Sequence, residues 1–235
     1  MLVSAVMITG KHPSRTNLAR VAVRCFLEQT YSEKELVIIN DSEIPLAVSN
    51  PQVREILVPF SPSVTLGDLR NLGIDHSRGD LLIQWDDDDW HHPNRIDRQV
   101  SAWTKGVAVL LREQIRYNSC NGNAFLHQNP KGIIGTILHE RRCAARYPSI
   151  RKAEDTRFLR QFHLQNVVHS IPPLYIRLCH GANTWEAKFI MGDLAANSVR
   201  NQWRLAFQAR KQLQFVVKHY YPFLEVRSSV GHEEH

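Results

Sequence analysis

Four consecutive carboxylates are the clearest candidates for chemistry in this sequence. Asp86 to Asp89 follow the apolar run Leu81–Trp85 and precede Trp90. Because nearby like charges raise carboxyl pKa values or destabilise a fold, a positive group is expected to offset them. Oxygen ligands at the end of a strand suit a hard ion such as Mg²⁺ or Mn²⁺, which can also hold substrate phosphates. A solvated acidic loop is the alternative, but the flanking tryptophans and the apolar run indicate a sheet edge.

A second pair of acids, Glu154 and Asp155, stands at the start of a predicted helix that carries Phe158 and Phe162 at core spacing. Acidic side chains near a helix N-terminus are stabilised by the helix dipole by about 0.3 to 1 kcal/mol. A purely structural role is therefore one interpretation of this pair.

Other metal and phosphate motifs are incomplete. A calcium-binding loop that starts at Asp86 needs glycine at its sixth position, where His91 stands. The segment from His139 begins like a zinc-protease motif, but Cys143 replaces the second histidine. The adjacent His91 and His92 are weaker ligand candidates, because neighbouring side chains usually point in different directions. Neither a P-loop nor a dinucleotide-binding glycine pattern occurs.

The positions of these acids depend on an alternation of strands and helices. Apolar runs that end in short polar segments are typical of strands covered on both faces, and α/β folds bind ligands at such strand ends. The predicted strands are residues 3–8, 36–39, 55–58, 81–85, 107–111, 123–127, 132–139, a short one near 167, and 174–179. The first predicted helix is capped by Ser14, and the others span 66–76, open at Pro93 and span 153–162. This order predicts an α/β fold with a mostly parallel central sheet flanked by helices.

Composition favours a globular domain with an anionic partner. The 235 residues are 43% apolar, carry a formal net charge of +6, and contain no stretch of about 20 apolar residues that could span a membrane. The expected location is therefore the cytoplasm. Between Asp193 and Glu225 all charged residues are basic. We interpret 187–221 as a mostly helical segment that either packs on the core or meets anionic lipid at the inner face of the membrane.

The order of motifs resembles the inverting family 2 glycosyltransferases, which have the GT-A fold. The resemblance covers about residues 3 to 180 and rests on an ordered set of phrases that are each weak alone. Those phrases are Leu27–Tyr31, Ile38–Ser42, Arg70–Ile74, Arg78–Asp80 and Asp86–Arg95. The resemblance implies a Rossmann-like, GT-A catalytic domain over residues 1–185 that binds a nucleotide sugar. A basic, mostly helical extension would follow over 186–235.

The same resemblance implies roles for the acids that follow the strands. Asp41 would accept a hydrogen bond from the nucleobase or ribose, although an aspartate that only forms a turn is equally compatible. Asp86 would lie toward the ribose, and Asp87 would also contact the nucleotide sugar. Asp88 would be the nearest ligand of a Mn²⁺ or Mg²⁺ ion.

Four further residues receive roles from the resemblance. Arg70 would lie near the phosphates, where a guanidinium suits anionic oxygens, with a surface arginine as the competing interpretation. His180 would complete the metal or diphosphate site. Asp155 would be the catalytic base that accepts the proton of the acceptor hydroxyl, and Glu154 would orient the loop or bind the acceptor.

The sequence therefore predicts an inverting, metal-dependent, hexosyltransferase-like enzyme. It would move one sugar from a nucleotide sugar, expected to be a UDP-sugar, to a hydroxyl of a glycan or lipid-linked acceptor in cell-envelope polysaccharide synthesis. The segment Gly10–His12 departs from the family phrase after the first strand, which leaves the donor open. One alternative is a sugar-phosphate nucleotidyltransferase, but it would need a longer phosphate-binding loop. The other is an inactive binding module with this fold, and no signature of nucleic-acid binding supports it.

Overall fold

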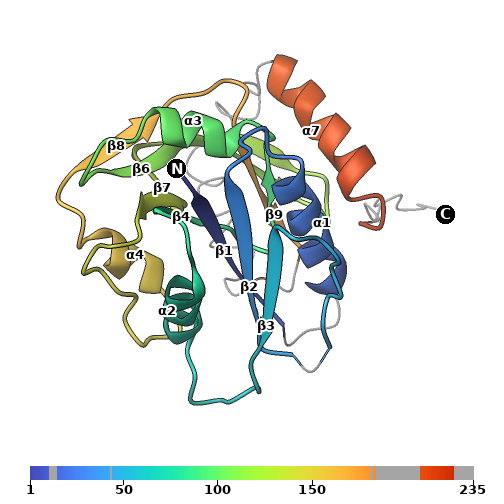
Figure 1. Cartoon of the computed structure of the whole chain (residues 1–235). Coiled ribbons are helices and arrows are strands. Elements are labelled where there is room, and N and C mark those ends of the chain that lie inside the picture. Colours follow the sequence, from blue (N-terminus) through green and yellow to red (C-terminus); the bar gives the residue numbers. More distant parts are fainter. Residues whose placement is uncertain (11–14, 43, 181–182, 184–206, 225–235) are drawn as a thin grey trace, which may run out of the picture.

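The computed structural model describes residues 1–10, 15–42, 44–180, 183 and 207–224. These residues form one curled sheet flanked by helices (Figure 1). The strands are β1 (Val3–Thr9), β2 (Lys34–Asn40), β3 (Val53–Leu57), β4 (Leu81–Gln84), β5 (Trp90–His91), β6 (Ala108–Asn118), β7 (Ala124–Glu140), β8 (Gln165–Val168) and β9 (Tyr175–Cys179). The helices are α1 (Arg15–Leu27), α2 (Leu66–His76), α3 (Arg95–Ser101), α4 (Glu154–Leu159) and α7 (Phe207–Tyr220).

The sheet has a parallel half and a mixed half. Its strand order is β3-β2-β1-β4-β7-β6-β9-β5, and β8 also pairs with β6. Strands β3, β2, β1 and β4 are mutually parallel, so their carboxyl ends meet at one edge. Strand β7 is antiparallel to β4 and β6, whereas β8 and β9 run parallel to β6 and β5 is antiparallel to β9. The segments that follow β1, β2 and β4 therefore lie beside one another.

Different helices cover the two faces of the sheet, because successive side chains of a strand point to opposite faces. Val3, Ala5 and Met7 of β1 point to the face on which α1, α3 and α7 pack. Val6 of β1 and Val37 of β2 point to the other face, where α2 and α4 pack. Figure 1 shows α1 and α2 on opposite sides of the parallel strands. Burial on both faces explains why these strands are continuous apolar runs in the sequence.

Helix α2 has the predicted bounds, and its start is fixed by a capping box. The Thr65 side chain accepts from the amide of Asp68, and the Asp68 carboxylate accepts from the amide of Thr65 at 2.8 Å. Helix α3 begins at Arg95 and not at Pro93, and α4 ends at Leu159, three residues earlier than predicted. The predicted cap at Ser14 lies outside the described residues.

The mixed half of the sheet differs most from prediction. The expected strands 123–127 and 132–139 are one strand, β7, and β6 continues seven residues beyond 111 to Asn118. The polar residues Glu113 and Gln114 of β6 are buried, and irregularities of register interrupt the β6–β7 pairing. Both features obscure the alternation of polar and apolar residues from which a strand is predicted. The short strand β5 was not predicted.

The described part of the C-terminal segment packs on the core. Val216 and Tyr221 are buried in the same cluster as α1. The Arg24 guanidinium of α1 lies 4.2 Å from the centre of the Tyr220 ring. Residues 187–206 lie outside the described residues. No helix among the described residues is long and apolar enough to cross a membrane.

Candidate active site

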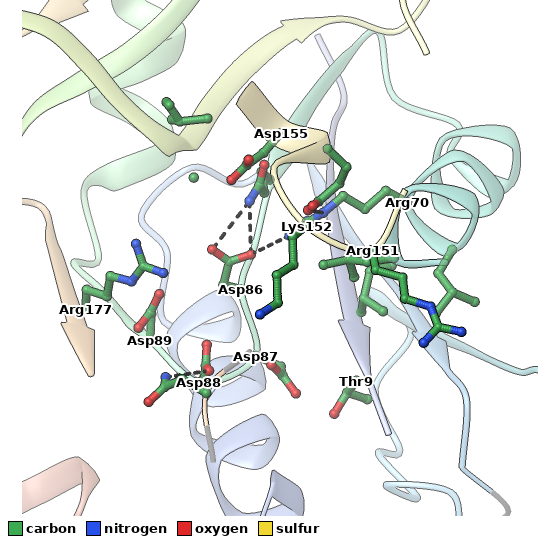
Figure 2. A pocket seen from close by; sticks show the side chains of 18 of the residues that line it. Thr9, Arg70, Asp86, Asp87, Asp88, Asp89, Arg151, Lys152, Asp155 and Arg177 are labelled. Atoms are coloured by element: carbon green, nitrogen blue, oxygen red, sulfur yellow. Dashed lines mark hydrogen bonds and ion pairs between the residues drawn. The ribbon is translucent and has the colours of Figure 1, made fainter. Parts of the chain in front are cut away.

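A cavity of about 680 Å³ lies at the carboxyl edge of the parallel strands and joins acids that are far apart in the sequence (Figure 2). The predicted site residues that line it are Asp41 after β2, Arg70 of α2, Asp86, Asp87 and Asp88 after β4, and Glu154 and Asp155 of α4. The fold therefore places the two predicted carboxylate clusters in one site. His180 does not line the cavity itself but contacts Asp88.

Two buried side chains, Arg95 and His91, contact main-chain carbonyls of the turn that carries the aspartates. Arg95 is fully buried and donates from Nη2 to the carbonyl of Gln84 at 3.0 Å. It also donates to Nδ1 of His91, whose Nε2 lies 3.2 Å from the carbonyl of Asp86 and donates to it. Burial lowers the pKa of Arg95 to about 10 and also keeps His91 neutral by lowering its pKa. These two side chains fix the backbone of the turn.

Arg15, at the start of α1, faces two of the aspartates. Its Nε donates to Asp87 Oδ2 at 3.1 Å, and its Nη2 donates to Asp87 Oδ1 and, at 3.1 Å, to Asp88 Oδ2. Burial raises the pKa of Asp87, and Arg15 opposes that shift. Arg15 therefore supplies the positive group that the sequence predicts beside the four aspartates.

Asp88 is the point at which several donors converge. Its Oδ2 accepts from Arg15 and from Nδ2 of Asn183 at 3.2 Å, and it lies 3.2 Å from Nε2 of His180. Although burial acts in the opposite direction, Arg15 and His180 hold the pKa of Asp88 below its usual range. Asp88 is thus an ionised carboxylate at the centre of the site.

The donor set at Asp88 fits part of the coordination shell of a hard divalent ion. A carboxylate oxygen of Asp88 and an imidazole nitrogen of His180 could hold such an ion. Within the described ranges, no group of three or more acidic, histidine or cysteine side chains is arranged as a complete metal site. An ion bound here would therefore take its remaining ligands from phosphate oxygens and water, as Mg²⁺ commonly does.

Asp86 belongs to a different ion pair. Arg70 donates from Nη2 to Asp86 Oδ1 at 3.1 Å and from Nε to Glu154 Oε1 at 3.2 Å. Gln84 Nε2 also donates to Asp86 Oδ1 at 3.1 Å. Burial raises the pKa of Glu154, and Arg70 opposes the shift. Arg70 therefore ties the aspartate turn to the start of α4 and is not the exposed helix arginine of the competing interpretation.

Asp89, the last of the four aspartates, is buried against β9. It accepts from the hydroxyl of Tyr175 and, at 2.8 Å, from the amide of Leu178 on β9. Burial, together with the charge of Asp88, raises its pKa well above the usual range. Figure 2 shows Arg177 of β9 beside it. Asp89 therefore attaches the aspartate turn to the mixed half of the sheet.

Asp155 lines the same cavity as the aspartate turn. It is partly exposed, and its Oδ1 accepts from the amide of Thr156 at 2.6 Å. The loop before it is fixed to α2, because Asn71 exchanges two hydrogen bonds with the backbone of Tyr147, at 2.8 and 2.9 Å. Figure 2 shows Lys152 extending from this loop toward the aspartates. A partly exposed carboxylate in this position can receive a proton from a bound hydroxyl.

Asp41 lines the cavity at the ends of β1 and β2. Its amide donates to the carbonyl of Thr9 at 3.0 Å, which joins the ends of β1 and β2. Gly10 has φ +140°, and a Cβ atom at this position would stand 2.0 Å from Asp41 Oδ1. Glycine is therefore required for Asp41 to occupy its place at the sheet edge.

Sequence reasoning missed three residues that shape the site, namely Arg15, Tyr175 and Arg177. Tyr175 and Arg177 lie on the same face of β9, and their two-residue spacing next to buried neighbours is a signal that could have revealed them. Arg15 has no comparable signal, because nothing in its local sequence indicates that it approaches aspartates 72 positions away.

Comparison with solved structures shows the same fold. The crystal structure of S. aureus TarS matches with a TM-score of 0.58 at 13% identity, over 94% of this chain and 44% of that chain. The structures of TarS 1-349 in complex with UDP and with UDP-GlcNAc match with TM-scores of 0.53 and 0.52, each at 13% identity. Those two matches cover 93% of this chain and 70% and 71% of the other chains. This chain therefore spans less than half of the longer TarS chain.

Sequence comparison identifies the family. No curated protein sequence matches this chain. The family model described as Glycosyl transferase family 2 matches residues 15–170, which is more than half of the chain and includes Arg15, the aspartate turn and Asp155. Together with the structural matches, this confirms the predicted α/β fold of the GT-A class. The chain belongs to glycosyl transferase family 2.

Proposed function

We propose that this chain is an inverting, metal-dependent glycosyltransferase that moves one sugar from a nucleotide sugar to a hydroxyl of a glycan or lipid-linked acceptor. The observation that carries the proposal is the shared cavity, which Asp41, the turn Asp86–Asp89 and Asp155 all line. Family membership supports glycosyl transfer as the reaction. The TarS complexes with UDP and UDP-GlcNAc support a nucleotide sugar, and we expect a UDP-sugar, as the donor.

In this proposal the donor runs from the ends of β1 and β2 toward α4. The nucleoside lies near Thr9 and Asp41, and the ribose lies toward Asp86. The diphosphate lies near Asp88, where the cations of Arg15 and Lys152 face the same space. Cations near the diphosphate stabilise the transition state, because negative charge grows on the leaving group as the glycosidic bond breaks.

We propose that Asp88 and His180 hold a Mn²⁺ or Mg²⁺ ion together with the donor phosphates. The ion would supply additional positive charge for the departing diphosphate. The support is the chemistry of the donor set, since the ionised carboxylate of Asp88 and the imidazole of His180 lie 3.2 Å apart. Asn183, which donates to the same carboxylate oxygen, would orient Asp88.

Asp155 is the proposed catalytic base. It takes the proton of the acceptor hydroxyl while the hydroxyl oxygen forms a bond to the anomeric carbon of the donor sugar. The bond from that carbon to the diphosphate oxygen breaks, and its electron pair leaves with the nucleoside diphosphate. A single displacement of this kind inverts the configuration at the anomeric carbon. Glu154, held by Arg70, positions Asp155 on the loop and the start of α4.

The test uses Asp155→Asn and a matched control. A panel of nucleotide sugars with and without Mn²⁺, followed by thermal shift, first identifies the donor. Asp155→Asn should then abolish transfer and leave metal-dependent nucleotide binding unchanged, because only the base is lost. Asp97→Asn, an exposed aspartate on α3, should leave both unchanged. Normal turnover of Asp155→Asn would remove Asp155 from this role, and a wild-type chain that binds no donor would favour an inactive binding module.

We also propose that the C-terminal segment contacts membranes peripherally when the acceptor is lipid-linked. The support comes from the outer side of α7, where Phe215 is 54% exposed and lies among the exposed basic residues Arg210, Lys211 and Lys218. Basic helices with exposed aromatic side chains bind anionic lipid surfaces.

A further inference from the structure

Two arginines stand side by side on neighbouring strands of the mixed half of the sheet. Arg116 of β6 and Arg177 of β9 are direct partners in the parallel pairing, so their side chains point to the same face. Gln114, two residues before Arg116, and its β7 partner His127 share this face. All four line the cavity. We refer to Gln114, Arg116, His127 and Arg177 as the basic strip.

The basic strip concentrates positive charge on one wall of the cavity. Although burial acts in the opposite direction, the nearby carboxylates of Asp89, Asp86 and Asp88 raise the pKa of Arg177, so both arginines are present as cations at the cavity wall. Beside Arg177 lies Asp89, whose carboxylate interacts with the charge of Arg177 and also accepts hydrogen bonds from Tyr175 and Leu178. The Arg116 guanidinium lies 5.8 Å from the centre of the Phe125 ring, a contact that orients it. The planar fork of a guanidinium matches carboxylate and phosphate groups, and here two such forks face the same cavity.

The basic strip lies on the side of the cavity away from the proposed nucleoside site. In Figure 2, Arg177 lies beyond Asp89 on one side of the aspartate turn, whereas Thr9 and Arg151 lie on the other. In the proposed function the nucleoside of the donor occupies the side of Thr9, and the diphosphate extends from there to Asp88. The remaining wall, formed by β6, β7 and β9, therefore faces the space that is left for the acceptor.

We propose that the acceptor carries an anionic group, a phosphate or a carboxylate, which Arg116 and Arg177 bind together. Gln114 and His127 supply further polar contacts beside this group. The inference rests on the proposed function, because that function places the donor and so leaves the wall with Arg116 and Arg177 to the acceptor. It assigns the acceptor to a chemical class, which neither the family nor the neighbouring structures define.

The experiment compares two probes that differ only in the anionic group, methyl α-glucoside 6-phosphate and methyl α-glucoside. Each is titrated into the full chain by NMR, with UDP and Mn²⁺ present in excess to fill the donor side, and again without them. The wild-type chain should bind the phosphorylated sugar at least tenfold more tightly. Arg116→Gln and Arg177→Gln should each reduce this preference to less than threefold, whereas Arg98→Gln, an exposed arginine on α3, should keep it.

Separate controls distinguish this inference from the proposed function. Equal affinity for the two probes, or an unchanged preference in both glutamine variants, would overturn it. Weaker binding of UDP by Arg177→Gln with an unchanged sugar preference would place Arg177 on the donor side and also overturn it. Arg177→Lys keeps the charge and should retain part of the preference, which preserves the test if Arg177→Gln does not fold. Absence of UDP binding in the wild-type chain would count against the proposed function alone.

Discussion

Replacing Arg15 by glutamine removes the cation that faces two of the four aspartates. Asp87 is only 2% exposed, and both of its carboxylate oxygens accept from Arg15. Removing one partner of a buried ion pair costs about 3 to 5 kcal/mol. Asp88 keeps its contacts with His180 and Asn183, so we expect the free energy of unfolding to fall by about 3 kcal/mol, the lower end of this range. For a chain of this length, about 3 kcal/mol lowers the melting temperature by roughly 6 to 12 °C.

The pH dependence of Arg15→Gln identifies the cause of the loss. Burial raises the pKa of Asp87 in the folded protein, so the folded state binds a proton that the unfolded state has released. Stability attributable to Asp87 therefore falls as pH rises from the usual carboxyl pKa through the raised folded value. Without the opposing charge of Arg15 this effect should increase, so the loss should be larger at pH 8 than at pH 5.

The assay is thermal unfolding of the wild-type chain, Arg15→Gln and Arg20→Gln at both pH values. Arg20 is an exposed arginine on the same helix and should have little effect. Excess Mn²⁺ should stabilise Arg15→Gln more than the wild-type chain, because the ion replaces the missing charge. Melting of Arg15→Gln within about 2 °C of the wild-type chain at both pH values would refute the assignment of Arg15.

Three further predictions concern other parts of the chain. Burial lowers the pKa of His139 to about 4, so the free energy of unfolding should fall by about 3 kcal/mol as the pH drops from 6.5 to 4. Urea unfolding of His139→Gln should show a smaller dependence on pH over this range. Gly10→Ala should displace Asp41 and weaken UDP binding about tenfold, whereas Gly106→Ala, where a Cβ meets no neighbour within 4 Å, should not. The chain should sediment with anionic liposomes in a salt-sensitive way that Phe215→Ala weakens, and sedimentation unaffected by salt would contradict membrane contact.

The parallel half of the fold was predictable because each strand there is buried on both faces. The runs ending at Asn40 and Gln84 therefore stand out as apolar segments followed by polar residues. Since all parallel strands end at one edge, the acids that follow them are expected to lie together. Helix α2 was predictable for a different reason, because its capping pair, Thr65 and Asp68, is a local signal in the sequence.

The mixed half was less predictable because its strands carry buried polar groups. Glu113 is buried on β6 and accepts from the amide of Ser170 at 3.0 Å, a contact between distant segments that the sequence does not reveal. The pairing of Arg116 with Arg177 depends on the same long-range register. Arg15 was missed for a related reason, since its role depends on how α1 is placed relative to β4. Whether Asp88 and His180 bind a metal stays a prediction.

The anchoring of the aspartate turn has a consequence for how the site can vary. Arg95 contacts the carbonyl of Gln84, and His91 contacts the carbonyl of Asp86, so these two parts of the turn are fixed independently of its carboxylates. Among the described residues, the Asp88 carboxylate contacts only other side chains, so it can be exchanged while the backbone keeps its course. Such a turn permits donor preference to diverge among related chains, and it makes Asp88→Asn a test of chemistry that is not confounded by a change in shape.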